Sequence, residues 1–261
     1  MFSRTKRRSE GTFHRRLRRY GRLPDYRDIL YGAVREIPAT VPETIDLRSH
    51  CSGVEDQGAL GSCTANALAG GLEFLEMKYG VPFVDLSRLF CNEPLIEETV
   101  TFDSGAMLRD GVKTLVRQGV CSEKRWPYDI TKFARKPPAS RFKEGLDHQI
   151  TACQRILSLD EILACLAEGF PFVFGFAVDE SFESPRVAGT GIVEMPESDE
   201  HLIGGHAVLA VGYVQSERRF IVRNSWRSRW GMRGYFTIPF EYLADRALAD
   251  DFWTIRCAED M

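Results

Sequence analysis

A cysteine, a histidine and an asparagine lie far apart in this sequence, each in a setting that suits nucleophilic chemistry. Cys63 ends the glycine-containing stretch 57–63 and opens a run of helical periodicity. At the first turn of a helix, unpaired backbone N–H groups and the helix dipole favour the thiolate, which lowers the pKa of a cysteine. His206, 143 residues downstream, begins an apolar run and can serve as the base. Asn224 follows the apolar run 220–223, and its amide oxygen can accept a hydrogen bond from the imidazole ring.

Each of these residues also has an ordinary structural explanation when it is taken alone. Cys63 would more often be a buried thiol, His206 a satisfied core histidine and Asn224 a turn residue. Only their joint order favours catalysis. The seven cysteines are an odd number, so at least one thiol stays unpaired in a monomer, and Cys165 is expected to be a buried, inert helix residue. Their scattered spacing shows no metal-ligand pairs, and neither a metal nor a cofactor is expected.

Three helices are expected in the part of the chain that must position the cysteine. The first spans residues 63–79 and buries one face, and the second runs from near Ser104 to Gly119. The residues that these two helices are expected to turn toward the core are Leu68, Leu72, Leu75, Tyr79, Leu108, Val112, Leu115 and Val116. The third helix opens at Ser158, with Glu161 completing a capping box.

Four short apolar runs, rich in Val, Phe and Ile, predict strands later in the chain. These runs are residues 172–178, 206–214, 220–223 and 234–238. Helices first and strands later predict an α+β protein with segregated halves, and a cleft between two halves is a common place for a site.

Three segments, taken together, resemble the papain family of cysteine proteases. Residues 41–48, followed by residues 57–63, are similar to the start of a mature enzyme of that family, and residues 224–235 are similar to its asparagine segment. The resemblance covers residues 41 to about 240. It implies a papain-like two-lobed fold, with a helical N-terminal lobe, an antiparallel β-sheet or barrel in the C-terminal lobe, and the active-site cleft between them.

The resemblance also implies roles for individual residues. The catalytic residues would be Cys63, His206, Asn224 and Gln57, whose amide would join the Cys63 backbone N–H in an oxyanion hole. Trp226 would cover the bond between His206 and Asn224. The implied substrate-binding residues are Ser104, Gly105, Met107, Gly205, Ala207 and Trp226. The implied function is a cysteine endopeptidase that hydrolyses peptide or protein substrates through a thioester intermediate.

Four positions depart from the family's pattern and leave two other functions open. Leu60 replaces a half-cystine, which suits a bacterial-type branch of the family, and Ser104 replaces a glycine. Thr64 replaces the aromatic residue that follows the nucleophile, and Arg227 replaces a glycine. The alternatives are a papain-fold acyltransferase and a non-enzymatic binding protein whose cleft is blocked by Thr64 and Arg227.

The N-terminal head differs from the rest of the chain in its charge. Residues 1–40 hold 11 Lys and Arg against 4 Asp and Glu, while the remainder holds 23 against 33. We therefore divide the chain into a basic prosegment, residues 1–38, and a catalytic domain, residues 39–261. By resemblance the head is an intramolecular inhibitor of a zymogen. Two other interpretations remain for the head: a solvated arm, and an arm that contacts nucleic acid or an anionic surface.

The sequence also bears on the state and location of the chain. No run approaches the roughly 20 apolar residues of a membrane-spanning helix, and the charged start lacks the apolar core of a secretory signal. The expectation is a soluble monomer, cytoplasmic or exported by another route.

Overall fold

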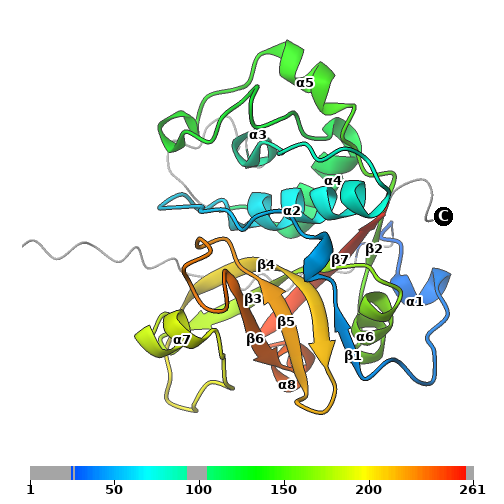
Figure 1. Ribbon diagram of the computed structural model, residues 1–261, viewed down its shortest axis with the longest axis vertical. Helices are drawn as coiled ribbons and strands as arrows, with labels where there is room; N and C mark the ends of the chain where they lie inside the picture. Colours follow the sequence, from blue (N-terminus) through cyan, green and yellow to red (C-terminus); the bar gives the residue numbers. More distant parts are fainter. Residues whose placement is uncertain (1–24, 26, 93–104, 257–261) are drawn as a thin grey trace, which may run out of the picture.

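Helices lie on both sides of a seven-stranded antiparallel sheet (Figure 1). The computed structural model describes Asp25, residues 27–92 and residues 105–256. Its helices are α1 (Tyr31–Val34), α2 (Cys63–Lys78), α3 (Arg88–Asn92), α4 (Leu108–Gln118), α5 (Ala139–Gly145), α6 (Leu159–Ala167), α7 (Pro185–Thr190) and α8 (Phe240–Ala244), with short 3₁₀ helices at Arg48–His50 and Ile130–Lys132. Its strands are β1 (Thr44–Asp46), β2 (Ala152–Arg155), β3 (Phe172–Asp179), β4 (Leu202–Val214), β5 (Arg219–Arg223), β6 (Tyr235–Pro239) and β7 (Ala249–Arg256).

The sheet is open and is built around its longest strand. The strand order is β2-β7-β3-β4-β5-β6, and β1 adds to β4 with Ile45 opposite Tyr213. Within residues 27–92 and 105–256 the terminal strands β2 and β6 do not pair with each other, so the sheet does not close into a barrel. The expected α+β class with an antiparallel sheet is confirmed.

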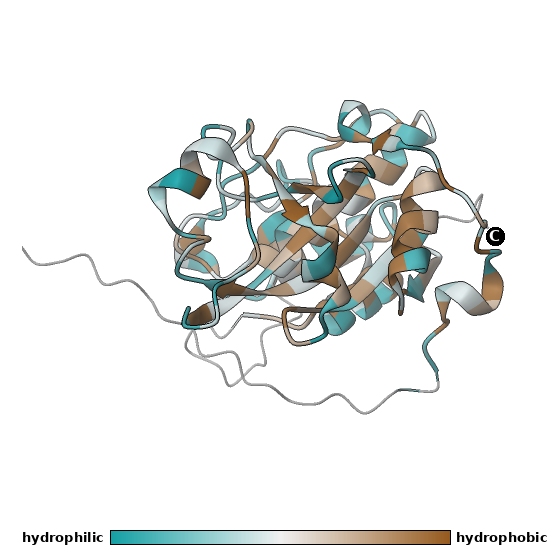
Figure 2. Ribbon diagram, turned by 90° about the horizontal axis from the view of Figure 1, so that it is seen from below, coloured by the Kyte–Doolittle hydropathy of each residue, from teal (hydrophilic) through white to brown (hydrophobic). Residues whose placement is uncertain are grey.

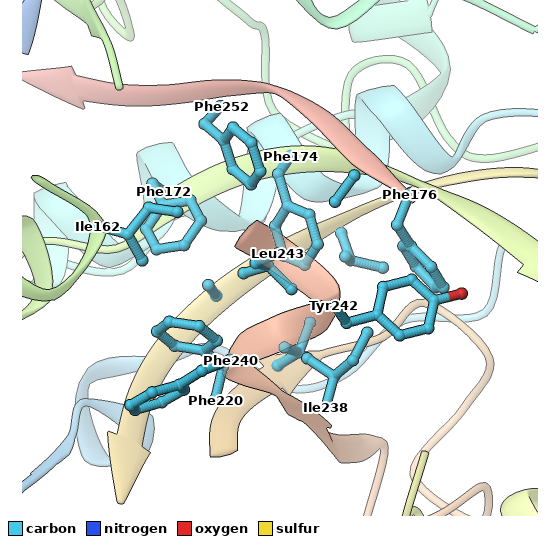
Figure 3. Packing of buried hydrophobic residues seen from close by; sticks show 14 of the residues in the cluster. Ile162, Phe172, Phe174, Phe176, Phe220, Ile238, Phe240, Tyr242, Leu243 and Phe252 are labelled. Atoms are coloured by element: carbon cyan, nitrogen blue, oxygen red, sulfur yellow. The ribbon is translucent and has the colours of Figure 1, made fainter. Parts of the chain in front are cut away.

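Two apolar cores cover the two faces of the sheet. On one face phenylalanines of β3, β5 and β7 pack against α6 and α8, as Figure 3 shows for Phe172, Phe174, Phe220, Phe240 and Phe252. On the other face, residues of β4 and β7 pack against α2 and α4. Strand residues alternate between the faces, so one strand serves both cores. Figure 2 shows apolar residues concentrated in the strands and helices at the middle of the molecule and polar residues in peripheral turns.

Helix α2 begins at Cys63, as expected, but it is buried on more than one face. All its residues from Cys63 to Glu76 are buried, because α2 contacts β4 on one side and α3 and α4 on others. Gly71 makes this packing possible, since an added Cβ would lie 3.3 Å from Ile255 Cδ1. Cys63 therefore lies at the start of a helix that is packed on several sides.

Helix α4 is shorter than expected and turns one predicted core residue to the surface. Residues 105–107 are not helical, and Ser104 lies outside the described residues. Val116 is 39% exposed, which contradicts its expected place in the core. Val112 and Leu115 already fill the inward face.

Helix α6 confirms most of the predicted capping. The Ser158 hydroxyl accepts the Glu161 backbone N–H at 3.2 Å. The Glu161 carboxylate, however, accepts the N–H of Leu157 at 2.6 Å, one residue before the cap. Cys165, on the same helix, is fully buried.

The described part of the head is joined to the body at α1. Tyr31 is 0% exposed and belongs to the core on the α6 side of the sheet. The backbone N–H of Arg155, on β2, donates to Ile29 O at 2.8 Å. Asp28 forms ion pairs with Arg109 and, at 3.8 Å, with Arg155. Within the head, residues 27–38 therefore lie against the catalytic lobes, far from the first turn of α2 (Figure 1).

None of the helices within residues 27–92 and 105–256 combines the length and the apolar character that crossing a bilayer requires.

Candidate active site

Cys63 is placed by a loop that is hydrogen-bonded to the opposite lobe. The backbone N–H of Gln57 donates to the carbonyl of Ser225 at 2.9 Å. Asp56 forms an antiparallel bridge with Trp226. These contacts join the approach to α2 directly to the segment that carries Asn224. Cys63 is 9% exposed at the end of this loop.

His206 lies on β4 and is oriented by Asn224. Its Nε2 is 2.8 Å from Asn224 Oδ1, and both residues are buried. Asn224 Oδ1 also accepts the Ser225 backbone N–H at 2.8 Å. Because this oxygen can only accept, Nε2 of His206 must carry a proton and donate it to Asn224 Oδ1. Asn224 thus engages Nε2 and leaves the second ring nitrogen, Nδ1, unoccupied by this contact.

An aromatic cluster encloses the imidazole. Trp226 stacks on His206 with ring centroids 5.0 Å apart and an interplanar angle of 26°. The ring centroids of Phe176 and Phe182 lie 5.8 and 6.3 Å from that of His206. This cover reduces the access of water to the bond between His206 and Asn224, and electrostatic interactions are stronger where water is excluded.

Gln57 is fixed at both ends of its side-chain amide. Its Oε1 accepts the Ser225 hydroxyl at 2.5 Å, and its Nε2 donates to Leu60 O at 3.1 Å. An amide nitrogen carries two N–H groups, so one of them stays available for an oxyanion. The sequence analysis quoted Ser225 within its motif but gave it no role, and this contact supplies one.

Tyr128 is a second positioning residue that the sequence analysis gave no role. Its hydroxyl donates to the backbone carbonyl of Gln57 at 2.9 Å and lies 2.5 Å from Ser62 Oγ. Asn66 reaches Ser62 O at 3.0 Å from the next turn of α2. No local sequence pattern shows that a distant tyrosine supports this loop.

A pocket of about 250 Å³ brings these groups together. It is lined by Gln57, Gly58, Ala59, Leu60, Cys63, Val178, Glu183, Ile203, Gly204, Gly205, His206 and Trp226. The pocket therefore joins residues of the helical lobe and of the sheet lobe, with a thiol, an imidazole and an amide at its surface. That set of groups can carry out acyl transfer through a cysteine nucleophile.

Comparison with known proteins agrees with this geometry. The profile of papain family cysteine proteases matches residues 41–244. The chain belongs to the papain family of cysteine proteases. It is 46% identical over 217 residues to an uncharacterized peptidase C1-like protein of Acanthamoeba polyphaga mimivirus, covering 78% of this chain and 70% of the viral protein. It is 30% identical over 222 residues to cathepsin L of Sarcophaga peregrina, covering 79% of this chain and 62% of that protein.

A solved structure shows the same fold. Xylellain, a cysteine protease from Xylella fastidiosa, has a TM-score of 0.82 and 38% identity, covering 98% of this chain and 100% of xylellain. The expected papain-like fold and likeness to bacterial members are confirmed.

Several residues that the resemblance predicts to bind substrate lie outside this pocket. Gly105 has a φ of +70°, which glycine adopts without strain, and Met107 is 47% exposed. Ala207 is buried and pairs with Gly175 of β3. Of the predicted substrate-binding residues only Gly205 and Trp226 line the pocket, and Ser104 lies outside the described residues.

Two departures from the papain-family pattern have structural explanations. Thr64 is buried, and its hydroxyl donates to Ala106 O at 2.8 Å, which ties α2 to the loop before α4. Arg227 has a φ of +67°, a conformation that favours glycine, and its side chain forms an ion pair with Asp56. Neither residue lines the pocket, so neither blocks it in this structure.

The other described thiols are poor nucleophiles. All six described cysteines are free. Burial raises the pKa of Cys51 and Cys165, that of Cys153 to about 11, and those of Cys91 and Cys121 to about 12. Cys257 lies outside the described residues. Cysteines with a raised pKa hold little thiolate at neutral pH and react slowly with electrophiles.

His148 has a partner, which the sequence analysis did not find. Its Nδ1 is 2.6 Å from Glu76 Oε1, and this hydrogen bond raises the pKa of His148. The pair joins α2 to the segment before β2 and lies outside the pocket that contains Cys63. It is a structural contact.

Proposed function

We propose that this papain-family chain is an endopeptidase in which Cys63, His206 and Asn224 hydrolyse peptide bonds through a thioester. The observation that carries the proposal is the 2.8 Å bond from His206 to Asn224, made where the imidazole shares a pocket with Cys63. Asn224 fixes the ring so that Nε2 is occupied and Nδ1 is available to the sulfur.

The reaction begins with Cys63 as the thiolate and His206 as the imidazolium. The sulfur attacks the substrate carbonyl carbon, and the carbonyl oxygen becomes an oxyanion held by the free N–H of Gln57 and the backbone N–H of Cys63. His206 gives its proton to the leaving amine, the C–N bond breaks, and a thioester remains on Cys63. Water then attacks the thioester, gives a proton to His206, and the carboxylic acid leaves as the thiolate re-forms.

Labelling with a thiol-directed peptide epoxide tests the proposal. We expect rapid labelling at Cys63 by mass spectrometry, and its loss in His206→Ala. Cys165→Ala is the matched control, since it removes a buried thiol of raised pKa and should label at the parent rate. Slow labelling spread over several cysteines would instead favour a non-enzymatic binding protein.

The ion pair also predicts the pH dependence of hydrolysis. Activity requires Cys63 as the thiolate and His206 as the imidazolium. With increasing pH the rate should therefore rise as the thiolate forms and fall as the imidazolium is lost. A flat profile from acid to alkaline pH would contradict the proposal. Adding an amine nucleophile to the same assay separates hydrolysis from acyl transfer, because a transferase would incorporate the amine.

We further propose that the basic head inhibits the enzyme before it is removed. The charge contrast supports this, since residues 1–40 have an excess of 7 positive charges and the remainder an excess of 10 negative charges. Tyr31 limits what can be removed without damage, because it is buried in the core. Asp25 also pairs with Arg109 at 3.0 Å, so the segment that can be removed without breaking these contacts is residues 1–24.

Two truncations test this proposal. Removing residues 1–24 should raise the rate of peptide hydrolysis and leave the thermal midpoint unchanged. Removing residues 1–38 should lower the thermal midpoint, because it empties the site of Tyr31. An unchanged rate after removal of residues 1–24 would contradict inhibition by the head.

A further inference from the structure

The pocket around the catalytic residues contains one carboxylate that the mechanism does not use. Among its lining residues only Cys63, His206 and Glu183 are ionisable. Cys63 and His206 are assigned to the chemistry. Glu183 is exposed, and within the described part of the chain no hydrogen bond or ion pair occupies its carboxylate.

The turn that carries Glu183 is held on both sides. Before it, the buried Asp179 accepts the Phe182 backbone N–H at 2.8 Å and the Ser181 hydroxyl at 2.8 Å. After it, the Ser184 hydroxyl accepts the Val187 N–H at 3.3 Å as the cap of α7. Glu183 is thus presented from a fixed backbone, and its own side chain remains free to reach a ligand.

Phe182 places this turn beside the catalytic base. Its ring is fully buried and contacts Trp226 at 5.3 Å, Trp230 at 5.6 Å and His206 at 6.3 Å. The next residue, Glu183, lines the same pocket as His206, the residue that would protonate the leaving amine. Gly105, Met107 and Ala207, which are also predicted to bind substrate, do not line this pocket. Because the pocket contains the imidazole that would protonate the leaving amine, it corresponds to the leaving-group half of the cleft in the proposed mechanism.

Within the residues that the structure describes, no ion pair reaches the Glu183 carboxylate. Two arginines of neighbouring segments have other partners: Arg227 pairs with Asp56, and Arg186 pairs with Glu194 at 3.5 Å. The remaining lining residues besides the ionisable ones are apolar, glycine or amide. A negative charge that is uncompensated in a cleft attracts a positively charged group on the ligand.

We infer that Glu183 selects substrates with a basic side chain just after the scissile bond, an inference that rests on the proposed peptidase function. Lysine and arginine reach across an open pocket on long flexible stems and leave their apolar part against Trp226. The carboxylate is exposed, so the preference is modest: an ion pair of this kind corresponds to about two- to fivefold in kcat/KM.

The test compares three fluorogenic peptides that differ only in the residue after the cleaved bond, which is lysine, glutamine or glutamate. With the parent enzyme we expect lysine to be preferred over glutamine, and glutamate to be worst. Glu183→Gln should bring the lysine-to-glutamine ratio of kcat/KM to about one, and Glu183→Lys should reverse it. The parent ratio should also fall toward one near 1 M salt, where the screening length is about 3 Å.

Glu180→Gln is the matched control, because Glu180 is an exposed carboxylate on the same turn that does not line the pocket. Its lysine-to-glutamine ratio should equal that of the parent. An unchanged ratio in Glu183→Gln, or an equal fall in both variants, overturns the inference. Epoxide labelling of Cys63 in the same preparations distinguishes failure of this inference from failure of the proposed peptidase function. If Cys63 is labelled but lysine is not preferred, only the role of Glu183 is refuted. If there is neither labelling nor hydrolysis, the peptidase function is refuted.

Discussion

Replacing Gln57 by alanine should slow the chemical step and leave substrate affinity nearly unchanged. The amide is held by Ser225 at Oε1 and by Leu60 O at Nε2, which leaves one N–H for the oxyanion. Loss of one such donor costs about 3 kcal/mol of transition-state stabilisation, so kcat should fall by about a hundredfold or more. Because the oxyanion exists only in the transition state, KM should change little.

Ser225→Ala tests whether the amide must be held in place. This variant removes one neutral hydrogen bond to Gln57, worth about 0.5–1.5 kcal/mol, and should lower kcat about two- to tenfold. If the Ser225 hydroxyl acts only by orienting the Gln57 amide, its removal has no further effect once that amide is gone, so the double variant Gln57→Ala/Ser225→Ala should have the kcat of Gln57→Ala.

The assay is steady-state hydrolysis of one fluorogenic peptide, with active sites counted by epoxide labelling and stability measured by urea unfolding. The labelling corrects for misfolded enzyme, since Gln57→Ala also leaves the buried Ser225 hydroxyl without its acceptor. A kcat for Gln57→Ala within threefold of the parent, or additive losses in the double variant, would refute the reasoning.

Asn224→Ala should lower kcat about 10- to 100-fold, because it removes a hydrogen bond to a charged ring. Stopped-flow or steady-state hydrolysis measures the effect, and a rate like that of the parent would contradict the role of Asn224. Tyr31→Ala should lower the free energy of unfolding by about 3–5 kcal/mol in urea, whereas Val34→Ala, on the exposed side of the same short helix, should change it by less than about 0.5 kcal/mol. Glu76 raises the pKa of His148, so the protonated ring stabilises the folded state below its ordinary pKa of 6.5, and this contribution is lost as pH rises through the raised value. His148→Gln should therefore cost about 1.5–3 kcal/mol in mildly acidic buffer and little in alkaline buffer, and an equal cost at both pH values would argue against the ion pair.

The catalytic arrangement was more predictable than the core that supports it. Cys63, His206 and Asn224 each occur in a short local pattern, and the order of the patterns was enough to predict that they meet. Ser225 was inside one of those patterns, yet its bond to Gln57 depends on the pairing of two distant segments. No local periodicity carries that information.

Misplaced or missed elements share one physical cause, which is tertiary contact. Strand β7 carries two aspartates directly after its first residue and ends with Arg256, so its sequence did not predict a buried strand. Arg256 is nevertheless fully buried, because it pairs with Glu168 and lies over the Phe170 ring. Tyr31 was counted with a polar head for the same reason: only the folded chain shows that an isolated aromatic residue has a core to enter.

The bridge between Asp56 and Trp226 makes the two lobes mechanically dependent on each other. The Gln57 backbone N–H donates to the carbonyl of Ser225, the residue that follows Asn224. A movement that separated residues 56–57 from residues 225–226 would therefore displace the proposed oxyanion donor and the residue that orients His206 at the same time.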